Sequence, residues 1–103
     1  MARTAEKKKV KEWSIKVKER DGNICVITNC GITKMLNAHH IIVKEIKELK
    51  FDVTNGISLC PKHHQFSREL SAHSNSFAFF VWLKENRPEQ YEYLRQKLRE
   101  LQI

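Results

Sequence analysis

Residues 55–64, NGISLCPKHH, place a thiol three positions before one histidine and a second histidine directly after it. The Asn-Gly pair predicts a turn, ISLC predicts a short strand, and Pro61 suits the first turn of a helix that runs to about Leu70. Neighbouring side chains on a helix point about 100° apart. If His63 faces a metal beside Cys60, His64 must face something else, so this stretch indicates two different metal sites.

The remaining chain predicts helices on both sides of a strand-rich centre. We expect an α+β fold in one domain, residues 1–103, with a motif core at about 20–70. Residues 20–23 are predicted to form a turn. Ser74 or Ser76 is predicted to cap the helix that ends at Asn86. The predicted strands are 24–27, 37–43 and 57–60, and the predicted helices are about 5–19, 61–70, 76–86 and, opened by Pro88, the last one to about 102. A loop with a helical turn is expected between the second strand and Asn55.

Basic residues are concentrated at the start of the chain. Lys and Arg outnumber Asp and Glu by 19 to 12, and residues 1–20 hold eight basic and three acidic residues, or five of the seven net positive charges. Such an asymmetry favours a polyanion such as nucleic acid, although a solvated helix face explains charge alone equally well. The candidate nucleic-acid contacts are Lys7, Lys8, Lys9, Lys11, Lys16 and Lys18.

The apolar runs are short. The longest, FAFFVWL at 77–83, is too short to cross a bilayer, and the N-terminus lacks an apolar stretch of signal-peptide type. We therefore expect a cytoplasmic protein that has no membrane partner. Trp13 and Trp82 are assigned to packing, as are the aromatic and leucine side chains of the last helix.

The cysteines and His63 form two ligand pairs. Cys25-x4-Cys30 and Cys60-x2-His63 are about thirty residues apart and supply the four soft or borderline ligands of a structural zinc site. An odd number of cysteines argues against a disulfide framework. The alternative is three buried thiols and a surface histidine.

The histidine pair His39-His40 is predicted on a strand. One of these imidazoles and His64 could hold a cation beside a phosphodiester, and the other could take a proton from water. Spacing alone does not say which of the two does which. The alternative is that these histidines are ordinary surface or core groups.

Together, AHHI at 38–41, NGISLC at 55–60 and KHH at 62–64, with RDGNIC at 20–25 before them, resemble the HNH endonucleases of the ββα-metal type over about residues 13–70. The resemblance implies a small ββα-metal core with structural zinc, like that of free-standing phage and bacterial members. It implies that His39 and His64 are ligands of the catalytic metal and that His40 is the general base. It also implies that Asn55 is a structural strut, and that Cys25, Cys60 and His63 hold zinc.

The sequence departs from the family at two positions. The family's usual second cysteine falls at Thr28, and the nearest thiol here is Cys30. His39 stands where many members have Asp, so Mn²⁺, or Ni²⁺ or Zn²⁺, is expected to serve better than Mg²⁺. Arg68, one helical turn beyond His64, is a candidate phosphate contact, and a solvent-facing arginine is the equal alternative. His73 could reach the cleft, but an interaction with the C-terminal end of the helix is the expected role.

These observations predict a metal-dependent DNA endonuclease that nicks double-stranded DNA with weak sequence specificity, as a monomer or weak homodimer. A non-catalytic, zinc-stapled nucleic-acid-binding module is the first alternative, and it leaves His39, His40 and His64 without a task. A structural protein on a decayed HNH scaffold is the second.

Overall fold

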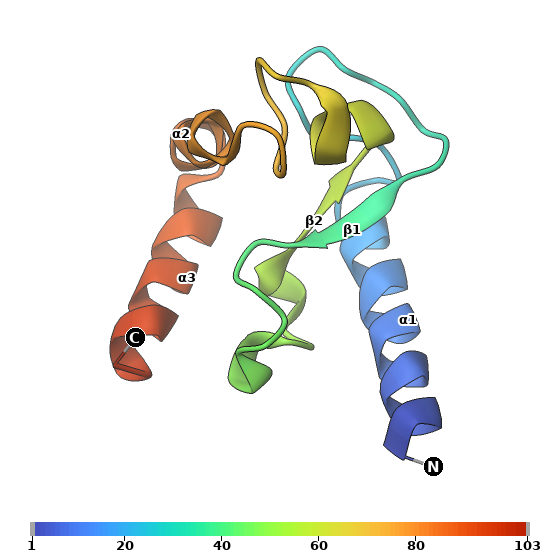
Figure 1. Cartoon of the computed structure of the whole chain (residues 1–103), viewed down its shortest axis with the longest axis vertical. Helices are drawn as coiled ribbons and strands as arrows, with labels where there is room; N and C mark the ends of the chain where they lie inside the picture. Colours follow the sequence, from blue (N-terminus) through green and yellow to red (C-terminus); the bar gives the residue numbers. More distant parts are fainter. Residues whose placement is uncertain (1, 103) are drawn as a thin grey trace.

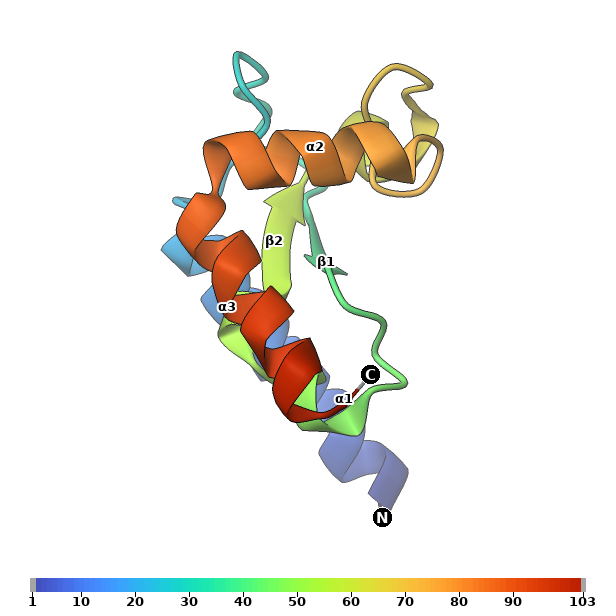
Figure 2. The same ribbon diagram turned by 90° about the vertical axis from the view of Figure 1, so that its left-hand side faces the viewer.

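The computed structural model describes residues 2–102, and a two-stranded hairpin lies at its centre (Figure 1). Helix α1 lies on one side of the hairpin, whereas α2 and α3 lie on the other (Figures 1 and 2). The elements are α1 (Ala2–Arg20), β1 (Asn37–His40), η1 (Lys47–Leu49), η2 (Val53–Asn55), β2 (Gly56–Leu59), η3 (Lys62–Phe66), α2 (Ser76–Asn86) and α3 (Pro88–Glu100). The predicted α+β class is confirmed.

The core forms where both helical layers meet β2. All residues of β2 are buried, because Trp13 and Val17 of α1 approach one side while Phe79, Leu83 and Leu94 of the C-terminal helices fill the other. A strand covered on both faces reads as a continuous apolar run, which is how ISLC reads in the sequence. No helix within residues 2–102 is both long enough and apolar enough to cross a membrane.

Gly56 permits the closest approach between α1 and the hairpin. A Cβ atom at this position would lie 2.4 Å from Val17 Cγ2 and 2.6 Å from Trp13 Cζ2, which is far inside van der Waals contact. The backbone of Gly56 is extended, at φ −131° and ψ 154°, and it begins β2. The turn predicted from Asn55-Gly56 is therefore wrong: the glycine is needed because a helix packs directly on its backbone.

The strands are shorter than the sequence predicts. The predicted strand at 24–27 is wrong, because Val26 N–H donates to Ser58 O (3.2 Å) while Cys25 N–H turns away to Ile32 O (2.8 Å). Strand β1 ends at His40 rather than at residue 43. Beyond His40, the segment that follows β1 is held by Asn55: Ile41 N–H donates to the Asn55 backbone carbonyl (3.1 Å).

The helix predicted for residues 61–70 is only one π-helical turn, Lys62–Phe66. Ser67 N–H donates to Lys62 O (2.8 Å), five residues back, and the chain then leaves the helix. The carbonyls that an α-helix would use at this point accept instead from a later segment, since His63 O bonds Ala72 N–H (2.9 Å) and His64 O bonds His73 N–H (3.0 Å). This fold-back ends the helix.

The flanking helices largely follow the prediction. Helix α1 begins and ends within a few residues of the expected bounds, and the turn after it has the predicted positive φ at Gly22 (76°) and Asn23 (56°). Pro88 opens α3 as expected. The cap of α2 is Asn75, whose side chain accepts from Ala78 N–H (3.1 Å), so the predicted Ser74 or Ser76 cap is wrong.

Asp21 joins the three layers. Its carboxylate is 2% exposed and accepts from Arg20, the last residue of α1, from Ser58 N–H in β2 (2.9 Å), and from Arg87 before α3 (2.9 Å). Burial opposes ionisation, but the hydrogen bonds from these partners hold the pKa of Asp21 below its usual range. The hairpin is thereby tied to both helical sides.

Candidate functional site

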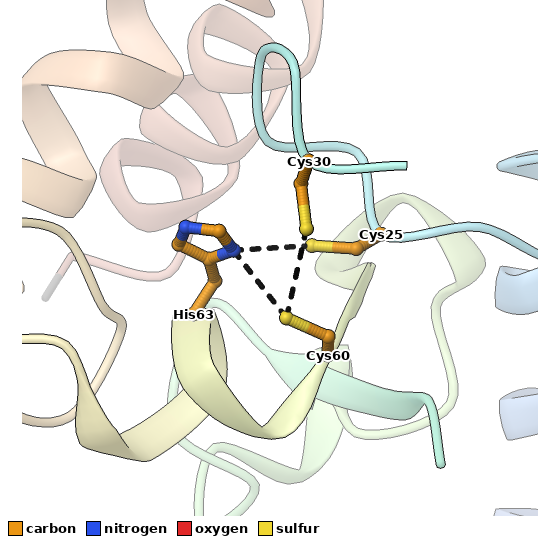
Figure 3. Close-up of side chains that lie close together, drawn as sticks. All are labelled: Cys25, Cys30, Cys60 and His63. Carbon is orange, nitrogen blue, oxygen red and sulfur yellow. Dashed lines mark hydrogen bonds between the residues drawn. The ribbon is translucent and has the colours of Figure 1, made fainter. Parts of the chain in front are cut away.

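Two short loops bring the three cysteines and His63 together. The loop 25–32 closes through Cys25 N–H to Ile32 O and turns at Cys30 N–H to Ile27 O (3.0 Å). The second pair follows β2, with Cys60 just after the strand and His63 in η3. Figure 3 shows the four side chains pointing toward one common centre.

The separations of these ligand atoms match the edges of a zinc tetrahedron. With Zn–S bonds of about 2.3 Å and Zn–N bonds of about 2.0–2.1 Å, tetrahedral angles place two sulfurs about 3.8 Å apart and sulfur and nitrogen about 3.5 Å apart. The Sγ atoms of Cys30 and Cys60 are 3.8 Å apart. His63 Nδ1 lies 3.6 Å from Cys25 Sγ and 3.4 Å from Cys60 Sγ. This cluster has the geometry to hold a zinc ion.

Cys30, rather than the residue at position 28, completes the cluster. The left-handed backbone at Asn29 (φ 64°) and Gly31 (φ 72°) turns the chain on both sides of Cys30. Thr28 is occupied elsewhere, because its Oγ1 accepts from Trp82 Nε1–H (3.1 Å). The longer Cys-x4-Cys spacing is therefore accommodated by two left-handed residues.

The electrostatics of the cluster favour a bound cation. Burial raises the pKa of the Cys25 thiol to about 12. Burial also opposes ionisation of Cys60, but hydrogen bonds from the His63 N–H and from neighbouring thiols hold its pKa below the ordinary value. Burial lowers the pKa of His63, which keeps its imidazole neutral. A cation at this centre would offset the cost of the buried thiolates.

A second cluster contains His39, His64 and His73. Their ligand nitrogens all lie within 4.8 Å of one another. The Nε2 atoms of His64 and His73 are 3.2 Å apart, and two nitrogens on one cation at about 2.1 Å lie about 3.0–3.4 Å apart for octahedral or tetrahedral angles. The ring of His39 stands edge-on to both other imidazoles, at centroid distances of 5.2 and 5.0 Å.

His39 and His64 are held in the neutral form that metals bind. Burial, reinforced by the neighbouring histidines, lowers the pKa of His39 to about 3. Burial and then the charge of His73 lower the pKa of His64. Neutral nitrogens with no carboxylate among them suit a divalent transition metal better than Mg²⁺.

His73 is the member of this cluster that the sequence prediction placed at a helix end instead. The helix before it ends at Phe66 rather than at Leu70, so the expected interaction of His73 with that helix end is wrong. It reaches the cluster because its backbone N–H bonds His64 O, nine residues earlier in the chain. The only sequence signal is a third histidine soon after the KHH motif, which fixes no geometry by itself.

His40 lies on the opposite side of β1 from His39, as alternation along a strand requires. Its ring stacks on Trp13 of α1, with centroids 3.8 Å apart and planes at 6°. Its Nε2 is 2.9 Å from the carbonyl oxygen of Lys50. A carbonyl only accepts, so Nε2 carries the proton and Nδ1 of the neutral ring keeps its lone pair. Burial lowers the pKa of His40, and the charges of Lys44 and Lys50 add to that effect.

Asn55 braces the segment that follows His40. It is fully buried; its Nδ2 donates to Ile42 O (2.9 Å) and Leu49 O (3.1 Å), while its Oδ1 accepts from Ile42 N–H (2.7 Å). These bonds close the connection between β1 and β2. The side chain points into this connection and has no free polar atom to offer a ligand.

A model of the HNH endonuclease family matches residues 25–72. This segment of the chain is similar to the HNH endonuclease domain. The resemblance drawn from AHHI, NGISLC and KHH is thereby confirmed. No curated protein and no solved structure was found to match the chain.

The HNH segment includes the zinc-compatible cluster, His39, His40, Asn55 and His64, and it ends one residue before His73. Helix α1, and with it Trp13, lies outside the segment. Arg68 is exposed beyond the end of η3, so the premise that one helical turn joins it to His64 is wrong.

The lysines of α1 fall on different sides of the helix. Lys18 lines a cleft with His40, Lys44 and Lys50. Lys9 and Lys16 line a separate hollow beside Phe51. The others, Lys7, Lys8 and Lys11, are exposed.

Proposed function

We propose that this chain is a metal-dependent DNA endonuclease that hydrolyses phosphodiester bonds one strand at a time. One observation carries the proposal. Adjacent residues of β1 present His39 to a cluster of three imidazoles and His40 as a fixed ring with an unprotonated Nδ1. A phosphodiester hydrolase needs both a cation site and a base.

His39, His64 and His73 are the residues that would hold the catalytic cation. The three nitrogens fit Mn²⁺, Ni²⁺ or Zn²⁺. Such a cation supplies charge stabilisation for the phosphate and for the departing 3′ oxygen. The protein keeps all three ligand atoms within 4.8 Å of one another, so little reorganisation is needed on binding.

His40 is the proposed general base. Its Nδ1 takes a proton from water, and the hydroxide attacks the phosphorus. The bond from phosphorus to the 3′ oxygen breaks, and that oxygen takes a proton from solvent water, which leaves 5′-phosphate and 3′-hydroxyl ends. The hydrogen bond to Lys50 O fixes the tautomer, and the lowered pKa keeps the ring neutral near pH 7. Asn55 acts through the backbone as the strut that holds the segment after His40.

Cys25, Cys30, Cys60 and His63 are proposed to hold a structural zinc ion. The ion would clamp loop 25–32 to the start of η3 and so fix the position of His64, the next residue after the His63 ligand. A small domain gains stability from such a staple.

Double-stranded DNA is the proposed substrate, because the chain carries a net charge of +7. One active site cuts one strand, so a monomer nicks. The proposed contacts of the protein are to DNA phosphates, which carry no base sequence information. The preference of the enzyme for particular DNA sequences is therefore expected to be weak.

A supercoiled-plasmid assay tests this function. Wild-type protein should convert the plasmid to nicked circles with Mn²⁺ or Ni²⁺ and not with EDTA, and His64→Ala should not. Lys62→Ala, an exposed neighbour in the same turn, is the matched control and should keep its activity. Undiminished cleavage in EDTA, or by His64→Ala, would contradict the proposal, and cleavage of RNA but not DNA would overturn the substrate.

A further inference from the structure

A cleft of about 350 Å³ lies between α1 and β1, and His40 is in its wall. The indole of Trp13 lines the cleft and stacks on His40. Ser14 and Asn37 add neutral polar groups, whereas Lys18, Lys44 and Lys50 add positive charge. A cleft with three cations beside a base suits an anion that reaches the base.

Two of these lysines are available to a ligand. Within residues 2–102, neither Lys18 nor Lys44 forms an ion pair. Lys50 is partly engaged, with its Nζ 3.6 Å from the exposed carboxylate of Glu6. The cleft therefore has at least two ammonium groups free to bind phosphate.

The helical register extends this charge along α1. Positions 7, 11, 14 and 18 follow the spacing of a single helix stripe, so Lys7 and Lys11 continue the line of Ser14 and Lys18 away from the cleft. The stripe is about 16 Å long at 1.5 Å per residue. Each DNA strand carries a phosphate about every 3.4 Å along its axis, so the stripe can meet several consecutive phosphates.

Lys9 and Lys16 lie on a different face of α1 from the stripe of Lys7, Lys11 and Lys18. They line the hollow with Phe51 on the other side of Trp13, and Lys9 Nζ lies 5.7 Å from the centroid of the Phe51 ring. A strand that lies in the cleft beside His40 would not pass these two lysines. The structure thus separates the lysines of one helix into two groups.

We infer that the cleft between α1 and β1 is the phosphate-binding groove that leads the nucleic-acid backbone to His40, with Lys18 and Lys44 as its main contacts. The inference rests on the proposed function for the identity of the strand that is cut. It assigns a binding task to α1, which lies outside the HNH segment. Lys7 and Lys11 extend the groove, whereas Lys9 and Lys16 do not take part.

Two double variants of equal charge change test the groove. Binding of a fluorescent 20-base-pair duplex is measured without added divalent metal and without chelator, over a range of salt concentrations, for wild type, for Lys18→Ala/Lys44→Ala and for Lys9→Ala/Lys16→Ala. Each lost phosphate contact should reduce the salt slope by about 0.9. For the Lys18→Ala/Lys44→Ala variant, the slope of log affinity against log salt concentration should therefore decrease by up to about 2, and the affinity at low salt should fall at least about tenfold. The affinity of the Lys9→Ala/Lys16→Ala variant should stay within about twofold of the wild-type affinity.

Equal losses in both variants would show diffuse attraction and overturn the groove, as would a wild-type protein that does not bind the duplex. Circular dichroism checks that both variants are folded. The assay contains no active metal, so it is independent of cleavage. A groove detected here together with no nicking in any metal would leave the binding inference intact and refute the nuclease.

Discussion

Gly56→Ala should displace the residue on which His40 stacks. The added Cβ would lie 2.4 Å from Val17 Cγ2 and 2.6 Å from Trp13 Cζ2. Carbon atoms in contact are about 3.5–4.0 Å apart, so both side chains must move by about 1 Å or more. His40 is opposite Gly56 in the strand register and stacks on the same indole, so the movement reaches the base.

The expected costs differ for stability and rate. Overpacking costs about 1–3 kcal/mol, and the lower entropy of the unfolded alanine chain offsets about 0.4–1 kcal/mol of it. We expect a net loss of about 1–2 kcal/mol in the free energy of unfolding, measured by urea denaturation. A 1 Å misplacement near a reacting group costs about 100-fold in rate, so single-turnover plasmid nicking should fall by about that factor.

Gly22→Ala is the matched control. Gly22 has φ 76°, and an added Cβ would meet only Ile24 Cγ2 at 3.9 Å. The strained left-handed backbone costs about 1–2 kcal/mol, similar to the change at Gly56, but it does not touch Trp13. The control should be destabilised yet keep the nicking rate of its folded fraction. Wild-type stability and rate in Gly56→Ala would refute the packing argument.

Three further changes follow from the two clusters and the lowered histidine pKa values. Cys30→Ser should lower zinc content and melting temperature together, as read by metal analysis and a thermal scan; an unchanged melt would exclude a staple. His73→Ala should weaken Mn²⁺ or Ni²⁺ binding by at least about tenfold in calorimetry, and unchanged affinity would remove His73 from the ligand set. In metal-free protein the free energy of unfolding should fall as pH drops from 7 to 4. The reason is that the pKa of His39 is about 3 when folded but about 6.5 when unfolded, so the unfolded chain takes up the proton first. A flat profile in urea titrations would contradict the buried neutral state.

The ligand pairs could be predicted because the determining information is local. Cys25 with Cys30 and Cys60 with His63 are close in sequence, and a site that needs four ligands predicts that the two pairs meet. His39 and His64 are far apart in sequence, so only the family resemblance predicts that they belong to one cluster and that His39 rather than His40 faces it. The alternation of side chains along β1 then separates His39 from His40.

The features that sequence reasoning missed depend on contacts between distant segments. His73 joins the second cluster only because the chain folds back after η3, and that fold-back depends on backbone bonds that no side-chain pattern encodes. The same bonds end the helix predicted to reach Leu70. The Asn55-Gly56 dipeptide is typical of a turn. The glycine is required here for another reason, because α1, some forty residues earlier in the chain, packs on its backbone.

The role of α1 was predicted too coarsely for a related reason. A count of lysines treats all exposed positions as equal, whereas the packing of α1 places Lys18 in the cleft beside His40 and Lys16 in the hollow beside Phe51. Charge composition therefore favours a kind of partner, and the packing leads to the proposed place where it binds.

The most direct test of the account compares wild type with His40→Ala under two conditions. Single-turnover nicking of supercoiled plasmid is measured at saturating protein with Mn²⁺ or Ni²⁺, and duplex binding is measured without added divalent metal and without chelator. The account predicts that His40→Ala binds DNA as wild type does and nicks at least about 100-fold more slowly. Equal nicking by both proteins would contradict the assignment of His40 as the base, and no nicking by either, with DNA still bound, would contradict the nuclease itself.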